Sequence, residues 1–263
     1  MTRFNALWIS DVHLGTPACR AHDLLQFLRG VEADRIYLVG DIVDLLHMRG
    51  RISLPQTHQD VISRFTELAA EGVEVLYIPG NHDHVARDFV NREILGVPIR
   101  FECEHTTADG RRLLITHGDI LDREIRTGTN LEAFGAAAYG LLLQLDVAIN
   151  RLRSRLGKDY LPVSQRVKGR IASAREYIDR FEAVAAAHAE RNGFDGIVCG
   201  HIHKPAVRQI GNVLYANDGD WVEHRTAVGE TPDGELVLLR YSSGAVDIER
   251  ETSAEEPAEP IAA

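Results

Sequence analysis

The chain has 263 residues, of which 44% are hydrophobic and 26% are charged, as in ordinary soluble globular proteins. Its net charge of −10 argues against nucleic acid as a partner and against general attraction to acidic membranes. Three widely spaced cysteines without a CxxC pair, and no apolar run of the ~20 residues that span a membrane, predict a cytoplasmic protein.

Short apolar runs rich in β-branched residues alternate with amphipathic segments along much of the chain. Five such runs predict buried strands, at 6–10, 35–40, 73–79, 112–117 and 196–200. Between the first three strands, residues 21–30 and 58–71 carry apolar side chains at helical spacing. This alternation is typical of an α/β domain, which we expect to occupy residues 1–250.

The C-terminal part of the chain predicts two hairpins and a tail. Residues 206–210 and 213–216 flank Gly211-Asn212, and residues 224–229 and 235–241 flank a TPDG turn. The last residues, 251–263, are acidic and rich in proline and alanine, which predicts a disordered tail.

The middle of the chain differs from the rest, because it lacks strand patterns from about residue 122 to residue 192. Apolar residues between Leu131 and Leu156 recur at helical spacing, and Asn192-Gly193 is a good helix stop. Residues 151–180 contain nine lysines and arginines but three acidic residues. We therefore expect a helical insertion with a basic face.

Each predicted core strand is followed by side chains that can bind metal ions. They are Asp11 and His13, then Asp41 and Asp44, then Asn81, His82 and Asp83, then His117 and Asp119, and finally His201 and His203. Any one of these blocks could be ordinary turn chemistry, but five in succession at strand ends indicate a site, because ligands gather at such ends. The oxygen and imidazole groups suit Mn, Fe or Zn.

The order D-x-H, GD-x-x-D, GNHD, H and GH-x-H resembles the calcineurin-like metallophosphoesterases over about residues 4–229. The resemblance implies a two-sheet α/β sandwich flanked by helices, with the helical insertion as a lid. It also implies two divalent metal ions, with manganese first and iron or zinc as alternatives. The implied reaction is in-line attack on phosphorus by a hydroxide that bridges the metals.

The same resemblance assigns roles position by position. One metal takes Asp11, His13 and His203, the second takes Asn81, His117 and His201, and Asp41 bridges the pair. His82 is implied as the acid at the departing group, with Asp83 as the partner that orients its ring.

The helical insertion is similar to that of the bacterial UDP-2,3-diacylglucosamine pyrophosphohydrolases of lipid A synthesis. In that group the lid holds acyl chains, and the likeness implies substrate contacts at Asp119, Asp122, Ser164 and Lys168. A basic, amphipathic lid also favours peripheral contact with the inner membrane.

Two alternatives stay open. The lipid A enzymes carry arginine where this chain has His82, the form found in general phosphodiesterases. The chain could therefore be a phosphodiesterase or phosphatase acting on small nucleotides or on another lipid phosphate. A binding scaffold without activity is the third reading, which the complete set of ligand positions disfavours.

Overall fold

The computed structural model describes residues 2–48, 54–126 and 168–250, and for residues 168–173 it describes the backbone. The chain divides into two compact units. The larger unit combines Met1–Ile120 with Ala185–Ala263, and the smaller unit is Leu121–Val184. All strands found in the described residues belong to the larger unit.

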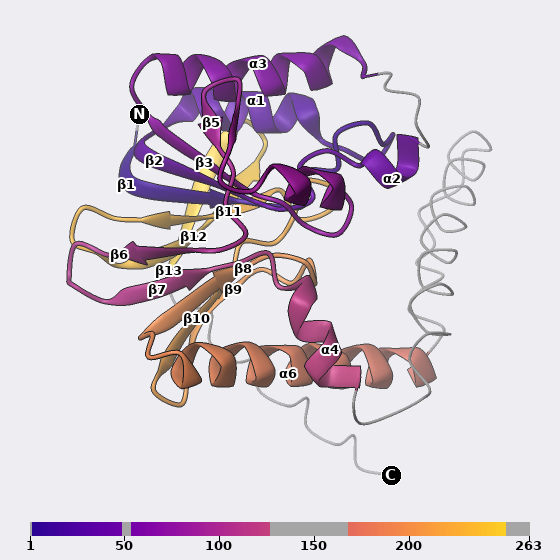
Figure 1. Ribbon diagram of the computed structural model, residues 1–263, viewed down its shortest axis with the longest axis vertical. Helices are drawn as coiled ribbons and strands as arrows, with labels where there is room; N and C mark the ends of the chain where they lie inside the picture. The colour runs from indigo at the N-terminus through magenta and orange to yellow at the C-terminus, as the bar shows by residue number, and fades with distance from the viewer. Residues whose placement is uncertain (1, 49–53, 127–167, 251–263) are drawn as a thin grey trace. The chain divides into compact units, whose positions relative to one another are not determined.

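The first sheet of the larger unit has six strands. They are β1 (Thr2–Ile9), β2 (Val31–Val39), β3 (Glu74–Ile78), β11 (Thr226–Glu230), β12 (Leu236–Ser242) and β13 (Ala245–Arg250). Their order is β13-β12-β11-β1-β2-β3 (Figure 1). Strands β1, β2 and β3 are parallel, whereas β11 runs antiparallel to β1. The carboxyl ends of the three parallel strands therefore meet at one edge.

The second sheet has five strands. They are β6 (Cys103–Thr106), β7 (Arg112–Ile115), β8 (Gly196–Cys199), β9 (Ala206–Ile210) and β10 (Val213–Asn217). Their order is β6-β7-β8-β10-β9, with β7, β8 and β10 parallel. A small hairpin, β4 (Glu93–Ile94) with β5 (Val97–Pro98), lies between β3 and β6 in the chain.

Two hydrophobic cores hold these layers together. Helices α1 (Ala21–Gly30) and α3 (Gln56–Ala70) cover one face of the first sheet, and the second sheet packs on the other face (Figure 1). Alternate residues of β1 supply both cores: Leu7 packs in the helix-side cluster and Trp8 in the cluster between the sheets. Trp8 is fully buried and stacks on Tyr37, with ring centroids 5.5 Å apart.

The remaining helices are short, with one exception. They are α2 (Leu45–Met48), the 3-10 helices η1 (His84–Phe89) and η2 (Asp119–Leu121), α4 (Asp122–Arg126) and the 24-residue α6 (Lys168–Arg191). Helix α6 ends at the predicted Asn192-Gly193 stop, where Gly193 has a φ of +74°. Within the described ranges, no helix combines the length and apolar character needed to cross a membrane.

The predicted α/β class, the two sheets, the five core strands, both hairpins and both N-terminal helices are confirmed. Strand β11 begins two residues later than expected, because residues 221–224 form turns. The expected insertion at 122–192 and the tail at 251–263 stay predictions, since residues 127–167 and 251–263 lie outside the described parts of the chain.

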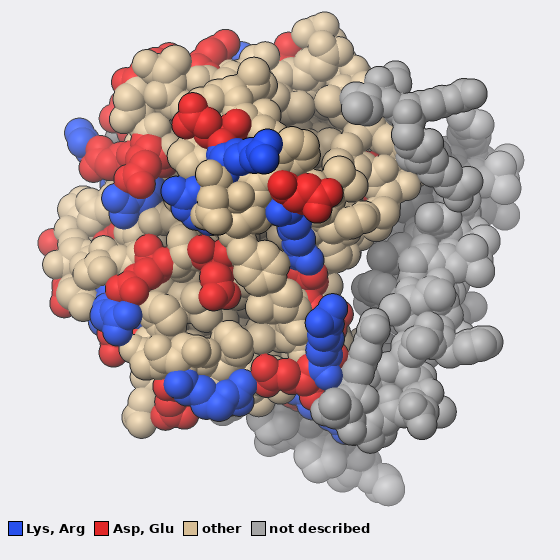
Figure 2. Space-filling model, viewed as in Figure 1, with Lys and Arg blue, Asp and Glu red and all other residues tan. Residues whose placement is uncertain are grey.

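Acidic and basic side chains are interspersed on the face of the molecule shown in Figure 2. The ion pairs of the larger unit include Arg112 with Glu104 at 2.7 Å and Arg35 with Glu74 at 2.6 Å. The negative net charge is therefore offset locally by pairing, and such exposed pairs contribute little to stability.

A buried hydrogen bond joins the two sheets beside the middle of β1. The Nε2 atom of His105 in β6 donates to Glu230 Oε2 in β11 at 2.8 Å, and Glu230 Oε1 accepts the Ala108 N–H at 2.7 Å. Burial opposes ionisation of Glu230, but the hydrogen bonds from His105 and Ala108 outweigh it and lower the pKa of this carboxyl below 4.5.

Replacing Glu230 with glutamine is expected to lower the free energy of unfolding at pH 7 by about 1–3 kcal/mol, because it weakens buried hydrogen bonds. A lowered pKa in the folded state means that this contribution is complete above pH 4.5 and disappears as the pH falls through the folded value. Chemical denaturation of both proteins between pH 7 and pH 3 should show the difference shrinking. A difference that stays constant would contradict this expectation.

Candidate metal centre

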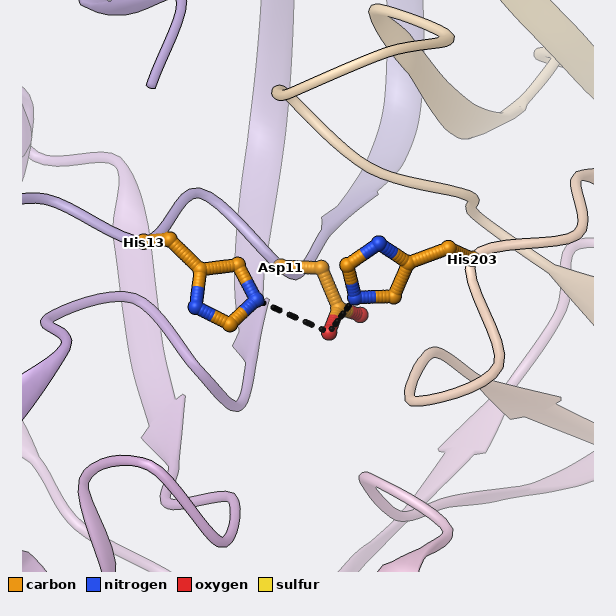
Figure 3. Close-up of side chains that lie close together, drawn as sticks. All are labelled: Asp11, His13 and His203. Carbon is orange, nitrogen blue, oxygen red and sulfur yellow. Dashed lines mark ion pairs between the residues drawn. The ribbon is translucent and has the colours of Figure 1, made fainter. Parts of the chain in front are cut away.

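The loops that follow β1 and β8 bring three predicted ligands together. Figure 3 shows Asp11 between the two imidazoles of His13 and His203. The Asp11 Oδ1 atom lies 2.9 Å from His203 Nε2 and 3.7 Å from His13 Nε2. Residues from opposite ends of the sequence thus meet because β1 and β8 both end at this edge.

Overlapping sets of side chains have their ligand atoms within 4.8 Å of one another. They are Asp11, His13 and His203, then His13, Asp41 and His82, and then Asp11, Asp41 and His117. Because the sets share Asp11, His13 and Asp41, they form one continuous centre. Each of these three residues belongs to two of the sets.

A second group of predicted ligands surrounds His117. Its Nε2 atom lies 3.4 Å from Asp41 Oδ2 and 3.2 Å from Asn81 Oδ1. Its Nδ1 atom is 2.8 Å from the Val39 carbonyl oxygen, which can only accept, so Nδ1 carries a proton. The other ring nitrogen is therefore free to bind a metal. The ring of His201 lies 5.3 Å from that of His117, measured between centroids.

The electrostatics of the centre favour bound positive charge. Burial alone would lower the pKa of His13 and of His117, but carboxylates raise both to about 10: Asp11 and Asp44 act on His13, and Asp41 acts on His117. Burial works against ionisation of Asp11, yet the surrounding histidines hold its pKa well below 3.8. A divalent cation would be stabilised by the same negative charges and would compete with protons for the carboxylate oxygens and ring nitrogens.

Three atoms of the candidate ligand sets are buried without an aligned hydrogen bond: Asp11 Oδ1, His13 Nε2 and His82 Nδ1. The first two face the middle of the first group, which fits a role as metal ligands. Together with Asn81 and Asp41, the donor set consists of oxygen and imidazole nitrogen. That combination suits manganese, iron or zinc.

The backbone of the candidate ligands is strained. Five of them have a positive φ: Asp11 at 49°, His13 at 52°, Asp41 at 53°, His201 at 70° and His203 at 53°. Residues other than glycine rarely adopt this left-handed backbone conformation, and each such residue costs of order 1–3 kcal/mol of stability. Backbone hydrogen bonds such as His13 N to Asp41 O at 2.9 Å hold the loops in place.

Gly80 leaves room for two of the ligands. A Cβ atom at this position would lie 2.3 Å from Asp41 Oδ1 and 2.7 Å from the His117 ring. Both neighbours are buried, so neither can move away. The glycine of the GNHD block is therefore needed for close approach of the backbone to the centre.

His82 lies at the exposed side of the centre, with about a third of its side chain accessible. Its backbone N–H donates to Asp41 Oδ1 at 2.7 Å, and its Nδ1 atom lies 3.0 Å from Asp44 Oδ2. The same Asp44 oxygen is 3.1 Å from His13 Nδ1. Burial would raise the pKa of Asp44, but the contacts with His13 and His82 lower it below its ordinary value.

Asp44, and not Asp83, is the carboxylate against the His82 ring. Asp83 Oδ1 accepts the Gly80 N–H at 2.6 Å, and its Oδ2 accepts the Ile42 N–H at 2.8 Å. Asp83 therefore ties the loop after β3 to the loop after β2, and the expected pairing with His82 is corrected. Asp44 could have been found from the GD-x-x-D block, whose second carboxylate had no predicted role.

The predicted substrate contacts have different surroundings. Asp119 Oδ1 forms an ion pair with Arg87 Nη2 at 2.7 Å, and Arg87 also donates to the Pro79 carbonyl at 3.1 Å. In the smaller unit, Asp122 Oδ1 accepts the Tyr177 hydroxyl at 2.7 Å. Ser164 and the side chain of Lys168 lie outside the described parts of the chain, although Lys168 begins α6.

The loop after β10 holds Asp220, which the sequence did not single out. Its Oδ1 atom accepts the N–H groups of Val222 at 2.8 Å and of Glu223 at 2.5 Å. Its Oδ2 atom contacts His224 Nδ1 and lies 3.9 Å from His203 Nδ1. Asp220 thus supports His203 from the side opposite to Asp11. The available signal in the sequence was its place in the stretch GDWVEH, residues 219–224.

The chain matches known proteins along most of its length. The model of the calcineurin-like phosphoesterase family matches residues 4–205. The UDP-2,3-diacylglucosamine hydrolase of Klebsiella pneumoniae is 28% identical over 253 residues, covering 89% of this chain and 98% of the relative. That of Salmonella paratyphi B is 27% identical over 254 residues, with the same coverage.

Among solved structures, Yfce, a phosphoesterase from E. coli, aligns with a TM-score of 0.46 and 18% identity, covering 92% of this chain and 95% of that one. The family match contains every loop that supplies a candidate ligand, from Asp11 to His203. The chain therefore belongs to the calcineurin-like phosphoesterase family and is a metal-dependent phosphoesterase.

Proposed function

We propose that this protein hydrolyses the pyrophosphate bond of UDP-2,3-diacylglucosamine or of a closely similar nucleotide-linked lipid. The observation that carries the hydrolytic part is the continuous centre in which three ligand sets overlap at Asp11, His13 and Asp41. The substrate class rests on the curated relatives, whose printed name is UDP-2,3-diacylglucosamine hydrolase and which align over nearly their whole length.

The proposed ligands fall into two groups. One divalent cation takes Asp11, His13 and His203, the other takes Asn81, His117 and His201, and Asp41 contributes to both. Manganese is proposed first, with iron and zinc as alternatives that the same donors accept. Two such cations, when bound, supply Lewis acidity at the phosphoryl oxygens and lower the pKa of the attacking water.

Other residues of the protein orient the proposed ligands and the proposed acid. Val39 and Asp44 fix which ring nitrogen of His117 and of His13 faces the centre. Asp44 also holds His82 Nδ1, so that Nε2 is presented for proton donation to the departing oxygen. Asp83 keeps the two loops that carry Asp41 and His82 together.

Substrate contacts of Asp119, Asp122, Ser164 and Lys168, the lid and a peripheral contact with the inner membrane belong to the same proposal. Several exposed apolar side chains support contact with lipid. Val85, Phe89 and Leu95 follow the GNHD block closely, and between 40% and 70% of each residue is accessible. Clusters of exposed apolar side chains commonly mark interaction surfaces.

The second candidate is a phosphodiesterase or phosphatase that acts on small nucleotides or on another lipid phosphate. The His82–Asp44 contact favours it, because a histidine held by a carboxylate is suited to protonate the alkoxide of an ordinary phosphodiester. The two candidates share the same centre and differ in what lies beyond the scissile phosphate.

A substrate comparison separates the two candidates. Turnover with Mn²⁺ should be measured for UDP-diacylglucosamine, UDP-glucose, cyclic AMP and a lipid phosphate, with the Asp41→Asn variant as the background control. We expect kcat/KM for UDP-diacylglucosamine to exceed the others by at least about tenfold, which needs only about 1.4 kcal/mol of extra binding in the transition state. Preference for cyclic AMP or for UDP-glucose would favour the second candidate and contradict the first.

A further inference from the structure

A serine hydroxyl lies between two carboxyl groups behind the metal centre. The Ser10 Oγ atom is 2.5 Å from Asp11 Oδ2 and 2.5 Å from Asp218 Oδ1. Ser10 comes directly after β1, and Asp218 comes directly after β10. Both side chains are buried, and Asp218 has no accessible surface at all. The three groups form a chain of hydrogen bonds that leads from the interior to Asp11, a proposed metal ligand.

The number of protons that this hydrogen-bonded chain can share is limited. A serine hydroxyl carries one proton, so Ser10 can donate to only one of the two carboxyl groups. An ionised carboxylate has no proton to donate in return. Two contacts of 2.5 Å to one hydroxyl oxygen can both be hydrogen bonds only if one carboxyl group is protonated and donates to Ser10.

Asp11 is the partner that accepts. Its Oδ2 atom also accepts the His201 N–H at 2.9 Å, while its Oδ1 atom faces the histidines of the first ligand group. Every contact of Asp11 therefore calls for an ionised carboxylate. The proton donated to Ser10 must then come from the other carboxyl group.

Asp218 has the surroundings of a neutral acid. Its Oδ2 atom is buried and has no hydrogen-bond partner among the described residues. Burial, reinforced by the negative charge of Asp11, raises the pKa of Asp218 well above 3.8. A buried carboxyl group without a compensating partner is expected to be neutral, because an unpaired charge in the interior is costly.

We propose that Asp218 is a positioning residue that carries a proton and donates it in a hydrogen bond to Ser10, which in turn donates to Asp11. This chain fixes the outer oxygen of Asp11 and leaves Oδ1 directed at the metal position. It does so without adding another negative charge to a region that already contains Asp41 and Asp44. The proposal rests on Asp11 as a metal ligand and does not depend on the identity of the substrate.

The test compares two replacements of Asp218 by their affinity for Mn²⁺, measured by calorimetry without substrate. Asp218→Asn supplies an amide N–H in place of the acid O–H, whereas Asp218→Ala supplies nothing. We expect Asp218→Ala to weaken Mn²⁺ binding about 10- to 100-fold, the range for loss of a partner behind a ligand. Asp218→Asn should weaken Mn²⁺ binding by less than about tenfold, the lower limit of that range.

Glu230→Gln is the matched control, because it also converts a buried carboxyl group to an amide. Glu230 pairs with Ala6 in the register of β1, well before the centre, so its replacement should leave Mn²⁺ binding unchanged. Asp218→Asn that binds as weakly as Asp218→Ala would overturn the proposal. So would an alanine variant that binds like the wild type.

Infrared spectroscopy gives a second readout that needs neither the alanine variant nor a metal. The wild-type protein should show the C=O stretch of a protonated, buried carboxyl group at pH 7, and this band should be missing from Asp218→Asn. The absence of such a band in the wild type would overturn the proposal. A substrate comparison that contradicts the proposed function would not by itself contradict the role of Asp218.

Discussion

Replacing Asp41 with asparagine is expected to lower Mn²⁺-dependent turnover by about 1,000-fold or more, since several kcal/mol of transition-state stabilisation depend on the metal pair. Asp41 belongs to two of the candidate ligand sets, and its Oδ1 atom also accepts the His82 N–H. Asparagine keeps the shape of the side chain but removes the charge that the two proposed cations would share. Steady-state kinetics on a generic phosphodiester with added Mn²⁺ would measure the loss.

Asp34→Asn is the matched control for this variant. Asp34 belongs to β2, the strand that leads to Asp41, but its side chain is exposed and pairs with Arg3 at 2.7 Å. Its replacement should leave turnover unchanged. A loss of less than about tenfold in Asp41→Asn would mean that this carboxylate contributes little to the metal pair, contrary to the proposed centre.

Replacing His82 with alanine is expected to lower turnover by about 10²- to 10⁴-fold for a substrate with a poor leaving group, the usual contribution of a general acid. The loss should be much smaller for a p-nitrophenyl ester, because p-nitrophenolate departs without a proton. The affinity for Mn²⁺ should change little. Parallel kinetics with the two leaving groups, together with calorimetry, would measure these effects.

His84→Ala provides the comparison, since His84 is two residues further along, is exposed and contacts the Asn81 carbonyl oxygen through Nδ1. This replacement should leave the turnover of both esters nearly unchanged. His82 also belongs to the ligand set with His13 and Asp41. Equal losses for both leaving groups, together with weaker Mn²⁺ binding, would therefore identify His82 as a ligand and contradict its role as an acid.

The position of the centre could be predicted from the sequence because strand ends are local features. The apolar runs before Asp11, Asp41, Asn81, His117 and His201 all became buried strands, and parallel neighbours end at the same edge. The residue types after each strand then restricted the chemistry to oxygen and imidazole ligands. No contact between distant segments had to be known for this inference.

The partners behind the ligands were not predictable in this way. Asp44 reaches both His13 and His82, and Asp218 reaches Asp11 through Ser10, 208 positions away along the chain. Such contacts depend on the direction of each side chain in the folded loops, which spacing along the chain does not reveal. Asp83 shows the same limit, because its position beside His82 in sequence suggested a pairing that the loop geometry replaces.

Some strands were also missed for physical reasons. Strand β6 has the sequence CEHT, which is short and polar, and its burial comes from His105 meeting Tyr37 and Glu230 across the sheets. Strand β13 lies at the edge of the first sheet and is mostly exposed, so its alternation of apolar and polar residues is weak.

The metal content of the active protein tests the central claim most directly. Metal-free protein should be titrated with Mn²⁺ by calorimetry while hydrolysis of a phosphodiester is followed in the same samples. The two proposed ligand groups, with Asp41 between them, predict two Mn²⁺ ions per chain, with turnover that rises as they bind and disappears with a chelator. Full turnover in the presence of the chelator, or with a single ion bound per chain, would contradict the proposed centre.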